Sequence, residues 1–175
     1  IGDNYGPVLV AKKSLYAKDL KGKKIAVPGL NTTAYLLLKL FLPDFKEVVV
    51  PFDKILDAVE KDEVDAGLII HEAQLTYQKM GLFKVIDVAE WWGTQTGLPL
   101  PLGGIVARRD LSDEVQKQIS DLIRQSIQYA LDHKEEALAA ALPYARGLDP
   151  ERAGRFIEMY VNAMTVEMGR KGQKG

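Results

Sequence analysis

Short apolar runs alternate with helix-forming segments as far as Asp110, and this alternation limits the possible folds more than any other feature of the chain. The runs are rich in valine, isoleucine and leucine and are separated by turn residues, as strands are. The predicted strands are residues 7–13, 24–28, 48–51, 65–70, 83–86 and 105–108. Strands that alternate with helices favour a mostly parallel sheet with helices on its faces, because each parallel pair needs a crossover connection. We therefore predict an α/β fold.

Helix signals fill the segments between these strands. Residues 31–33 supply helix-start side chains ahead of an apolar stretch that Pro43 ends. Asp53 is predicted to cap a second helix, and residues 73–80 are predicted to form a short third one. The run 48–51 is continuous and β-branched, which predicts a strand buried on both faces of the sheet.

Only helices are predicted after Asp110. Ser112 is expected to cap a long amphipathic helix, and a second helix is expected over residues 135–142. Asp149 and Pro150 open a last helix. These helices carry an apolar stripe but have no sheet of their own to cover, so we predict a second lobe whose N-terminal part lies outside the chain. The predicted divisions are residues 1–13 as a hinge strand, residues 14–104 as one α/β lobe, and residues 105–175 as a return strand and helices of the other lobe.

The composition excludes several classes of function. Lysine and arginine total 23 and aspartate and glutamate total 24, and the net charge of -1 argues against a nucleic-acid or anionic-membrane surface. The chain has no cysteine, so disulfides, thiolate nucleophiles and Cys-based zinc sites are excluded. No apolar run approaches the roughly 20 residues that cross a bilayer. We therefore expect a small-molecule partner, no nucleic acid and no membrane insertion, and the oligomeric state stays open.

The turn after the second predicted strand is a candidate anion site. In open α/β sheets, ligands bind beyond the carboxyl ends of the strands. Gly29 is followed there by a helix start, whose free backbone amides, hydroxyls and dipole suit a carboxylate or a phosphate. The candidate residues are Asn31, Thr32, Thr33 and Ala34. No Gly-x-Gly or Gly-Lys-Thr pattern is present, so a single carboxylate fits better than a pyrophosphate, and an ordinary helix cap is the alternative.

His71 is the candidate general base. It stands at the tip of an apolar strand, where the sheet opens to solvent, and Glu72 follows it. An imidazole titrates near neutral pH and is the usual general base there, although a structural role is the alternative. The other histidine, His133, lies in a polar helix end, where solvation is the default. No second histidine or carboxylate cluster lies at ligand spacing, so we predict no metal.

Two further segments are candidates for the wall and the rim of a pocket. Trp91, Trp92 and residues 97–104 are predicted to form a stiff apolar loop, which either walls an aromatic ligand pocket or serves as a core hinge. Asn4 and Tyr5, flanked by glycines, are candidates for the rim.

Several of these motifs together resemble one known family. Residues 51–67 are similar to the second lobe of type II periplasmic-binding-protein folds, which transport receptors, regulator effector domains and some enzymes share. A more specific set resembles 1,4-dihydroxy-6-naphthoate synthase of the futalosine route to menaquinone. These motifs are Val27-Pro-Gly-x-x-Thr-Thr-Ala-Tyr35, Gly67-Leu-Ile-Ile-His-Glu72, Trp92, Thr96-Gly-Leu-Pro-Leu-Pro-Leu-Gly103 and Tyr160-Val-Asn162.

The resemblance implies a cytoplasmic lyase with two lobes around a cleft. It implies conversion of cyclic dehypoxanthine futalosine to the dihydroxynaphthoate without a metal or an organic cofactor. It also implies His71 as the general base and the turn of Thr32, Thr33 and Ala34 as the holder of a carboxylate or polar substrate group. Chorismate dehydratase of the same pathway and a solute-binding protein for a small carboxylate are the alternatives. A binding protein would need no base, so His71→Ala would leave its affinity intact.

Overall fold

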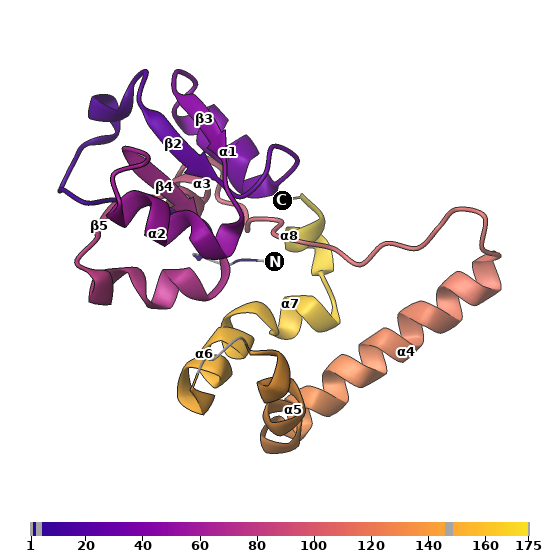
Figure 1. Cartoon of the computed structure of the whole chain (residues 1–175). Coiled ribbons are helices and arrows are strands. Elements are labelled where there is room, and N and C mark those ends of the chain that lie inside the picture. Colours follow the sequence, from indigo (N-terminus) through magenta and orange to yellow (C-terminus); the bar gives the residue numbers. More distant parts are fainter. Residues whose placement is uncertain (1, 3–4, 146–148, 175) are drawn as a thin grey trace. The chain divides into compact units, whose positions relative to one another are not determined.

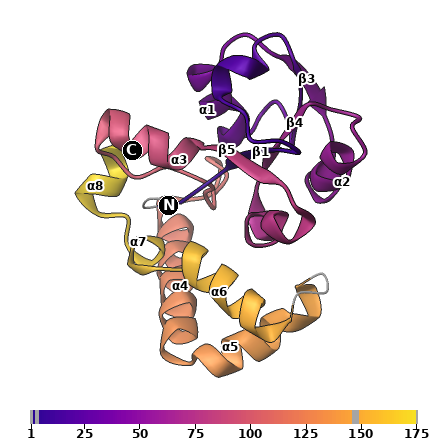
Figure 2. The same ribbon diagram turned by 90° about the vertical axis from the view of Figure 1, so that its left-hand side faces the viewer.

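The computed structural model of the chain describes residues 2, 5–145 and 149–174. The chain divides into two compact units, a sheet unit over Gly2–Leu102 and a helical unit over Gly103–Gly175 (Figures 1 and 2). Both segments that the sequence singles out for chemistry, residues 29–34 and His71, lie in the sheet unit. Asn4, a predicted rim residue, lies outside the described residues.

One open five-stranded sheet forms the centre of the sheet unit. Its strands are β1 (Val8–Ala11), β2 (Lys24–Val27), β3 (Lys46–Val49), β4 (Ala66–Ile69) and β5 (Phe83–Asp87). Their order across the sheet is β3-β2-β4-β1-β5. β2 pairs in parallel with β3 and β4, whereas β1 pairs antiparallel with β4 and β5. Four strands therefore run in one direction and β1 in the other. Two of the four pairings are parallel and two are antiparallel, so the sheet is mixed, and the predicted parallel pairing holds only for β3, β2 and β4.

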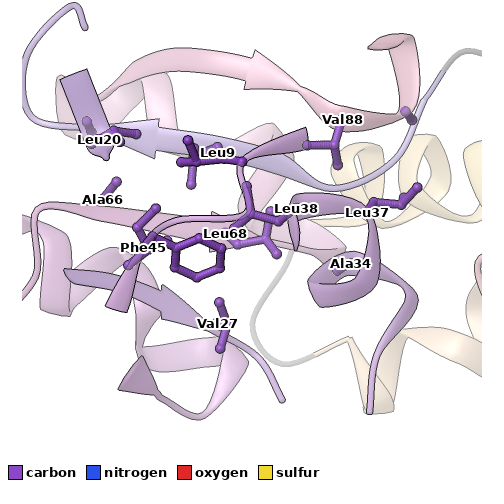
Figure 3. Close-up of a cluster of buried hydrophobic side chains, with 14 of the residues drawn as sticks. Leu9, Leu20, Val27, Ala34, Leu37, Leu38, Phe45, Ala66, Leu68 and Val88 are labelled. Atoms are coloured by element: carbon purple, nitrogen blue, oxygen red, sulfur yellow. The ribbon is translucent and has the colours of Figure 1, made fainter. Parts of the chain in front are cut away.

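Side chains that alternate along the strands pack into two apolar cores, one on each face of the sheet. The helices that complete these cores are α1 (Thr33–Phe41), α2 (Ile55–Glu60) and α3 (Val88–Thr96). Leu9 and Leu68 pack with α1 and α3 in one core (Figure 3). Val10 and Ile69 pack with α2 in the other. Burial of each of these aliphatic side chains stabilises the fold by about 1.5–3 kcal/mol, which makes the sheet unit a rigid support for residues at its edges.

The segment around β3 differs from its prediction. β3 lies at the edge of the sheet, and Val49 is 58% exposed, so the expectation of a strand buried on both faces is wrong. β-Branched composition suits an edge strand as well as a central one, and strand order alone decides between them. Asp53 does not cap a helix, because it lies inside a 3-10 turn (Phe52–Lys54) that precedes α2.

Three other local predictions also need correction. Trp91 and Trp92 lie within α3 rather than in a loop, because Asp87 caps a helix that the sequence analysis did not anticipate. The predicted helix over residues 73–80 is replaced by two 3-10 helices, His71–Leu75 and Tyr77–Met80. Residues 105–108 have no regular structure, since no strand of the described chain pairs with them.

The helical unit confirms the helix starts that the sequence predicts. Its helices are α4 (Asp113–Asp132), α5 (Lys134–Ala141), α6 (Pro150–Tyr160), α7 (Ala163–Val166) and α8 (Gly169–Lys174). The Ser112 hydroxyl accepts from the Val115 amide at 3.4 Å, and an Asp149 carboxylate oxygen accepts from the Arg152 amide at 2.9 Å. Among the residues with assigned structure, no helix is long and apolar enough to cross a membrane.

An apolar groove of about 240 Å³ runs along α4 within the helical unit. Ile119, Ile123 and Ile127 line it on one side, and the extended segment 105–107 lines it on another. α4 buries none of its residues, and Val106 is 90% exposed. The apolar stripe of α4 is therefore real but largely uncovered, as the sequence predicts for helices without a sheet of their own.

Candidate functional site

The carboxyl ends of three neighbouring strands meet at one edge of the sheet. Ile25 of β2 is paired with Ala66 of β4, and Val27 of β2 is paired with Val49 of β3, both in parallel. These registers bring the segments that follow β2, β3 and β4 to the same edge of the sheet. The turn into α1 and the candidate base therefore follow adjacent strands at the same edge, where ligands of open α/β sheets bind.

Thr32 shapes the start of α1 with its own hydroxyl. The Oγ1 atom accepts from the Tyr35 amide at 3.1 Å and donates to the Gly29 carbonyl at 2.8 Å. The Thr32 carbonyl accepts the first helical bond, from Leu36 at 3.1 Å. Gly29 has a φ of 157°, a conformation that residues with a side chain rarely adopt. The hydroxyl of Thr32 therefore closes the turn, and this local structure matches the ordinary cap that the sequence offers as the alternative.

Two backbone amides remain available at this helix start. The amides of Thr33 and Ala34 have no hydrogen-bond partner among the residues that the structure describes, as expected for the first turn of a helix. The Thr33 side chain is half-buried, Ala34 is buried and Asn31 is exposed. Together with the positive end of the α1 dipole, these amides can hold one carboxylate.

His71 leaves β4 in an unusual backbone conformation. Its φ is 56°, in the left-handed region, where histidine is enriched relative to most residues but still uncommon. The residue is exposed and opens the 3-10 helix that follows β4. Its ring lies against the ring of Phe52, with centroids 4.9 Å apart and planes tilted by 56°. The imidazole is therefore at the surface of the sheet edge rather than packed inside the core.

The other histidine and the tryptophans have structural roles. The ring of His133 stacks on Tyr129 at 4.0 Å, and its Nδ1 lies 2.9 Å from the Tyr129 carbonyl oxygen. Trp91 and Trp92 pack against the core on the α1 side of the sheet, with Trp91 edge-on to Phe41 at 5.4 Å. The tryptophans thus pack on the core, which favours the predicted role of a core hinge over that of a pocket wall. No cluster of three or more potential metal ligands occurs within the described part of the chain.

Asp87 is a half-buried acid at the end of β5 that the sequence analysis missed. One of its oxygens accepts from the amides of Ala89 and Glu90, at 3.0 and 3.1 Å, and so caps α3. Burial raises the pKa of the Asp87 carboxyl above its ordinary value, although these two amide hydrogen bonds oppose the shift. An aspartate placed directly between a strand and a helical run was the signal that could have identified this cap.

Asp87→Asn is expected to remove a loss of stability at higher pH. Because the pKa of Asp87 is raised on folding, the folded state holds the proton more tightly than the unfolded state. The stability that this group contributes is therefore complete below the ordinary pKa and falls as the pH rises through the folded pKa. Asparagine caps helices as well as aspartate does, so the helix start is kept.

Urea unfolding followed by tryptophan fluorescence reports on this prediction, because both tryptophans lie in α3 of the sheet unit. The free energy of unfolding of the wild type, minus that of Asp87→Asn, should decrease as the pH rises above about 4. A difference that does not change with pH would show that Asp87 titrates alike in the folded and unfolded chains.

Comparison with known proteins identifies the family. The family model described as "Menaquinone biosynthesis" matches residues 1–175. The chain belongs to this menaquinone biosynthesis family. It is 44% identical over 174 residues to the 1,4-dihydroxy-6-naphthoate synthase of Thermus thermophilus, covering 99% of this chain and 63% of that protein. It is 39% identical over 178 residues to the synthase of the same name from Streptomyces coelicolor, covering 98% of this chain and 62% of that protein. The chain thus spans less than two thirds of the length of these family members.

Solved structures agree with the fold. The crystal structure of an Archaeoglobus fulgidus protein matches with a TM-score of 0.94 and 52% identity, over 99% of this chain and 64% of that one. The periplasmic aliphatic sulphonate-binding protein of Escherichia coli matches with a TM-score of 0.64 and 20% identity, over 91% of this chain and 56% of that one. This chain therefore has the type II periplasmic-binding-protein-like fold that its sequence resembles.

Proposed function

We propose that this chain supplies the larger part of a 1,4-dihydroxy-6-naphthoate synthase, a carbon–carbon lyase of menaquinone biosynthesis. The observation that carries the proposal is the position of His71, which follows β4 directly beside the strand that leads into the α1 amides. The identity of 44% to the Thermus thermophilus synthase over almost the whole chain supports the same activity. The substrate would be cyclic dehypoxanthine futalosine, and the site of action the cytoplasm.

The proposed mechanism divides binding and proton transfer between two strand ends. The amides of Thr33 and Ala34 hold a carboxylate of the substrate, Thr32 shapes their turn, and Asn31 lies beside them on the surface. The imidazole of His71 removes a proton from the bound substrate. Loss of this proton starts the elimination that releases the naphthoate. Asn4 would complete the rim of the site.

We also propose that residues 14–104 form one lobe of a two-lobed enzyme, with residues 1–13 as the strand that enters it. Residues 105–175 would belong to the other lobe, whose remaining part comes from polypeptide outside this chain. The uncovered stripe of α4 and the unpaired segment 105–107 support this division, because a strand added there would pair the backbone and bury the apolar groove. The coverage of 63% of the Thermus thermophilus relative leaves room for such a segment.

Turnover of the cyclic futalosine by the full-length protein that carries this sequence tests the proposed activity. Formation of the naphthoate, followed by its absorbance, is the expected result. Tight binding of the substrate without product formation would support a solute-binding protein instead.

A further inference from the structure

The contact between Phe52 and His71 joins two strand ends that are not neighbours in the sheet. Phe52 follows β3 and His71 follows β4, and β2 lies between these two strands. The two rings nevertheless approach to 4.9 Å between centroids. Since neighbouring strands are about 4.8 Å apart, β3 and β4 are separated by about twice that distance, and the two side chains must reach toward each other across the end of β2.

We propose that Phe52 is a positioning residue for His71, which holds the imidazole over the end of β2 and next to the turn into α1. A histidine side chain has two rotatable bonds, and a general base works only when its nitrogen is held within hydrogen-bond reach of the proton that it removes. A ring packed against one face of the imidazole limits those rotations. The kinetic consequence of this inference rests on the proposed function, whereas the orientation of the ring does not.

The backbone on both sides of Phe52 is well anchored. Pro51 precedes it, and the Pro51 carbonyl accepts from the Lys54 amide at 2.8 Å, which closes the 3-10 turn around Phe52. Ile55 follows the turn and is fully buried in the core beneath α2. The Phe52 side chain itself is half-buried. The turn and the buried residue after it therefore hold the backbone of Phe52, and this places its ring against the imidazole of His71.

Replacement of Phe52 with leucine is expected to remove the ring contact with the imidazole without unfolding the sheet unit. Leucine keeps an apolar side chain but removes the aromatic ring. In the wild type, NMR should show nuclear Overhauser contacts between the His71 and Phe52 rings and a ring-current shift of the His71 protons. Phe52→Leu should abolish both and average the His71 side-chain couplings, whereas Phe52→Tyr should preserve them. The chain has two histidines, so His133→Asn assigns their signals.

Kinetics of the full-length protein provide the second measurement. Phe52→Leu should lower kcat by about 10-fold to 100-fold. KM should stay within about 2-fold of the wild type, because the amides of Thr33 and Ala34 that bind the carboxylate are unchanged. Phe52→Tyr should restore kcat to within about 2-fold of the wild type. Phe83→Leu is the matched control. Phe83 is half exposed at the start of β5, where it pairs with Ala11 at the opposite edge of the sheet. This variant should change neither the His71 signals nor kcat.

Two results would overturn the inference: an unchanged kcat in Phe52→Leu, or His71 couplings that stay those of one rotamer in that variant. Failure of the proposed activity looks different. If the wild type binds the futalosine but does not convert it, while the His71 signals respond to Phe52→Leu as expected, then the lyase is refuted and the orientation of His71 by Phe52 stands.

Discussion

His71→Asn is expected to lower kcat of the full-length protein by about 100-fold to 10,000-fold, the usual range for loss of a general base. Asparagine is the appropriate replacement, because it tolerates the left-handed backbone that His71 adopts at φ 56° and has no titratable group. KM should change little, since the carboxylate is held by the amides of Thr33 and Ala34 rather than by the imidazole. The assay follows the absorbance of the naphthoate with the cyclic futalosine as substrate.

The chain offers a matched control for this substitution. His133 is the other histidine and lies in the helical unit, where it stacks on Tyr129. His133→Asn should leave kcat unchanged. Turnover in His71→Asn at more than about a tenth of the wild-type rate would show that the base is another group. Loss of substrate affinity without a change in kcat would assign His71 to binding instead.

Gly67→Ala is expected to destabilise the sheet unit, because the added methyl group has no room on β4. A Cβ at Gly67 would lie 2.5 Å from Cγ2 of Ile55 and 2.7 Å from Cγ2 of Val59, both on α2. Ile55 and Val59 are fully buried, so neither methyl group can swing into solvent. α2 would have to move away from the sheet, at a cost of about 1–3 kcal/mol in the free energy of unfolding.

Urea unfolding by tryptophan fluorescence measures this loss, and two further variants separate its cause. Gly104→Ala should be close to neutral, because nothing lies within 4 Å of the added methyl group there. Val59→Ala combined with Gly67→Ala should be less destabilising than the sum of the two single changes, because it removes one of the two clashes. Strict additivity would mean that α2 does not press on β4 at Gly67.

The strands and helix starts of the chain could be predicted from local chemistry, but strand order could not. Strand β1 and the cap by Ser112 follow from apolar runs and capping residues that each act over a few positions. The edge position of β3 depends on which strands pair, which no single segment specifies. For this reason the burial predicted for residues 48–51 was wrong, while the strand itself was confirmed.

The candidate site could be predicted only in part, because some of its contacts depend on strand order. Because the carboxyl ends of parallel strands share one edge, the sequence predicted that the turn at Gly29 and the tip at His71 would lie near each other, and the register agrees. Phe52 was missed because its contact with His71 crosses β2 and exists only in the order β3-β2-β4. Asp87 was missed because its helix was read as a loop around the tryptophans.

An NMR titration of this chain with 2-naphthoate, a stable carboxylated naphthalene, tests most directly whether the α1 amides and the imidazole serve one ligand. The amide signals of Thr33 and Ala34 and the imidazole signals of His71 should shift along a single binding curve, while the signals of His133 stay in place. Shifts at the α1 amides with an unmoved His71, or shifts confined to other surfaces, would contradict a shared site at this edge of the sheet.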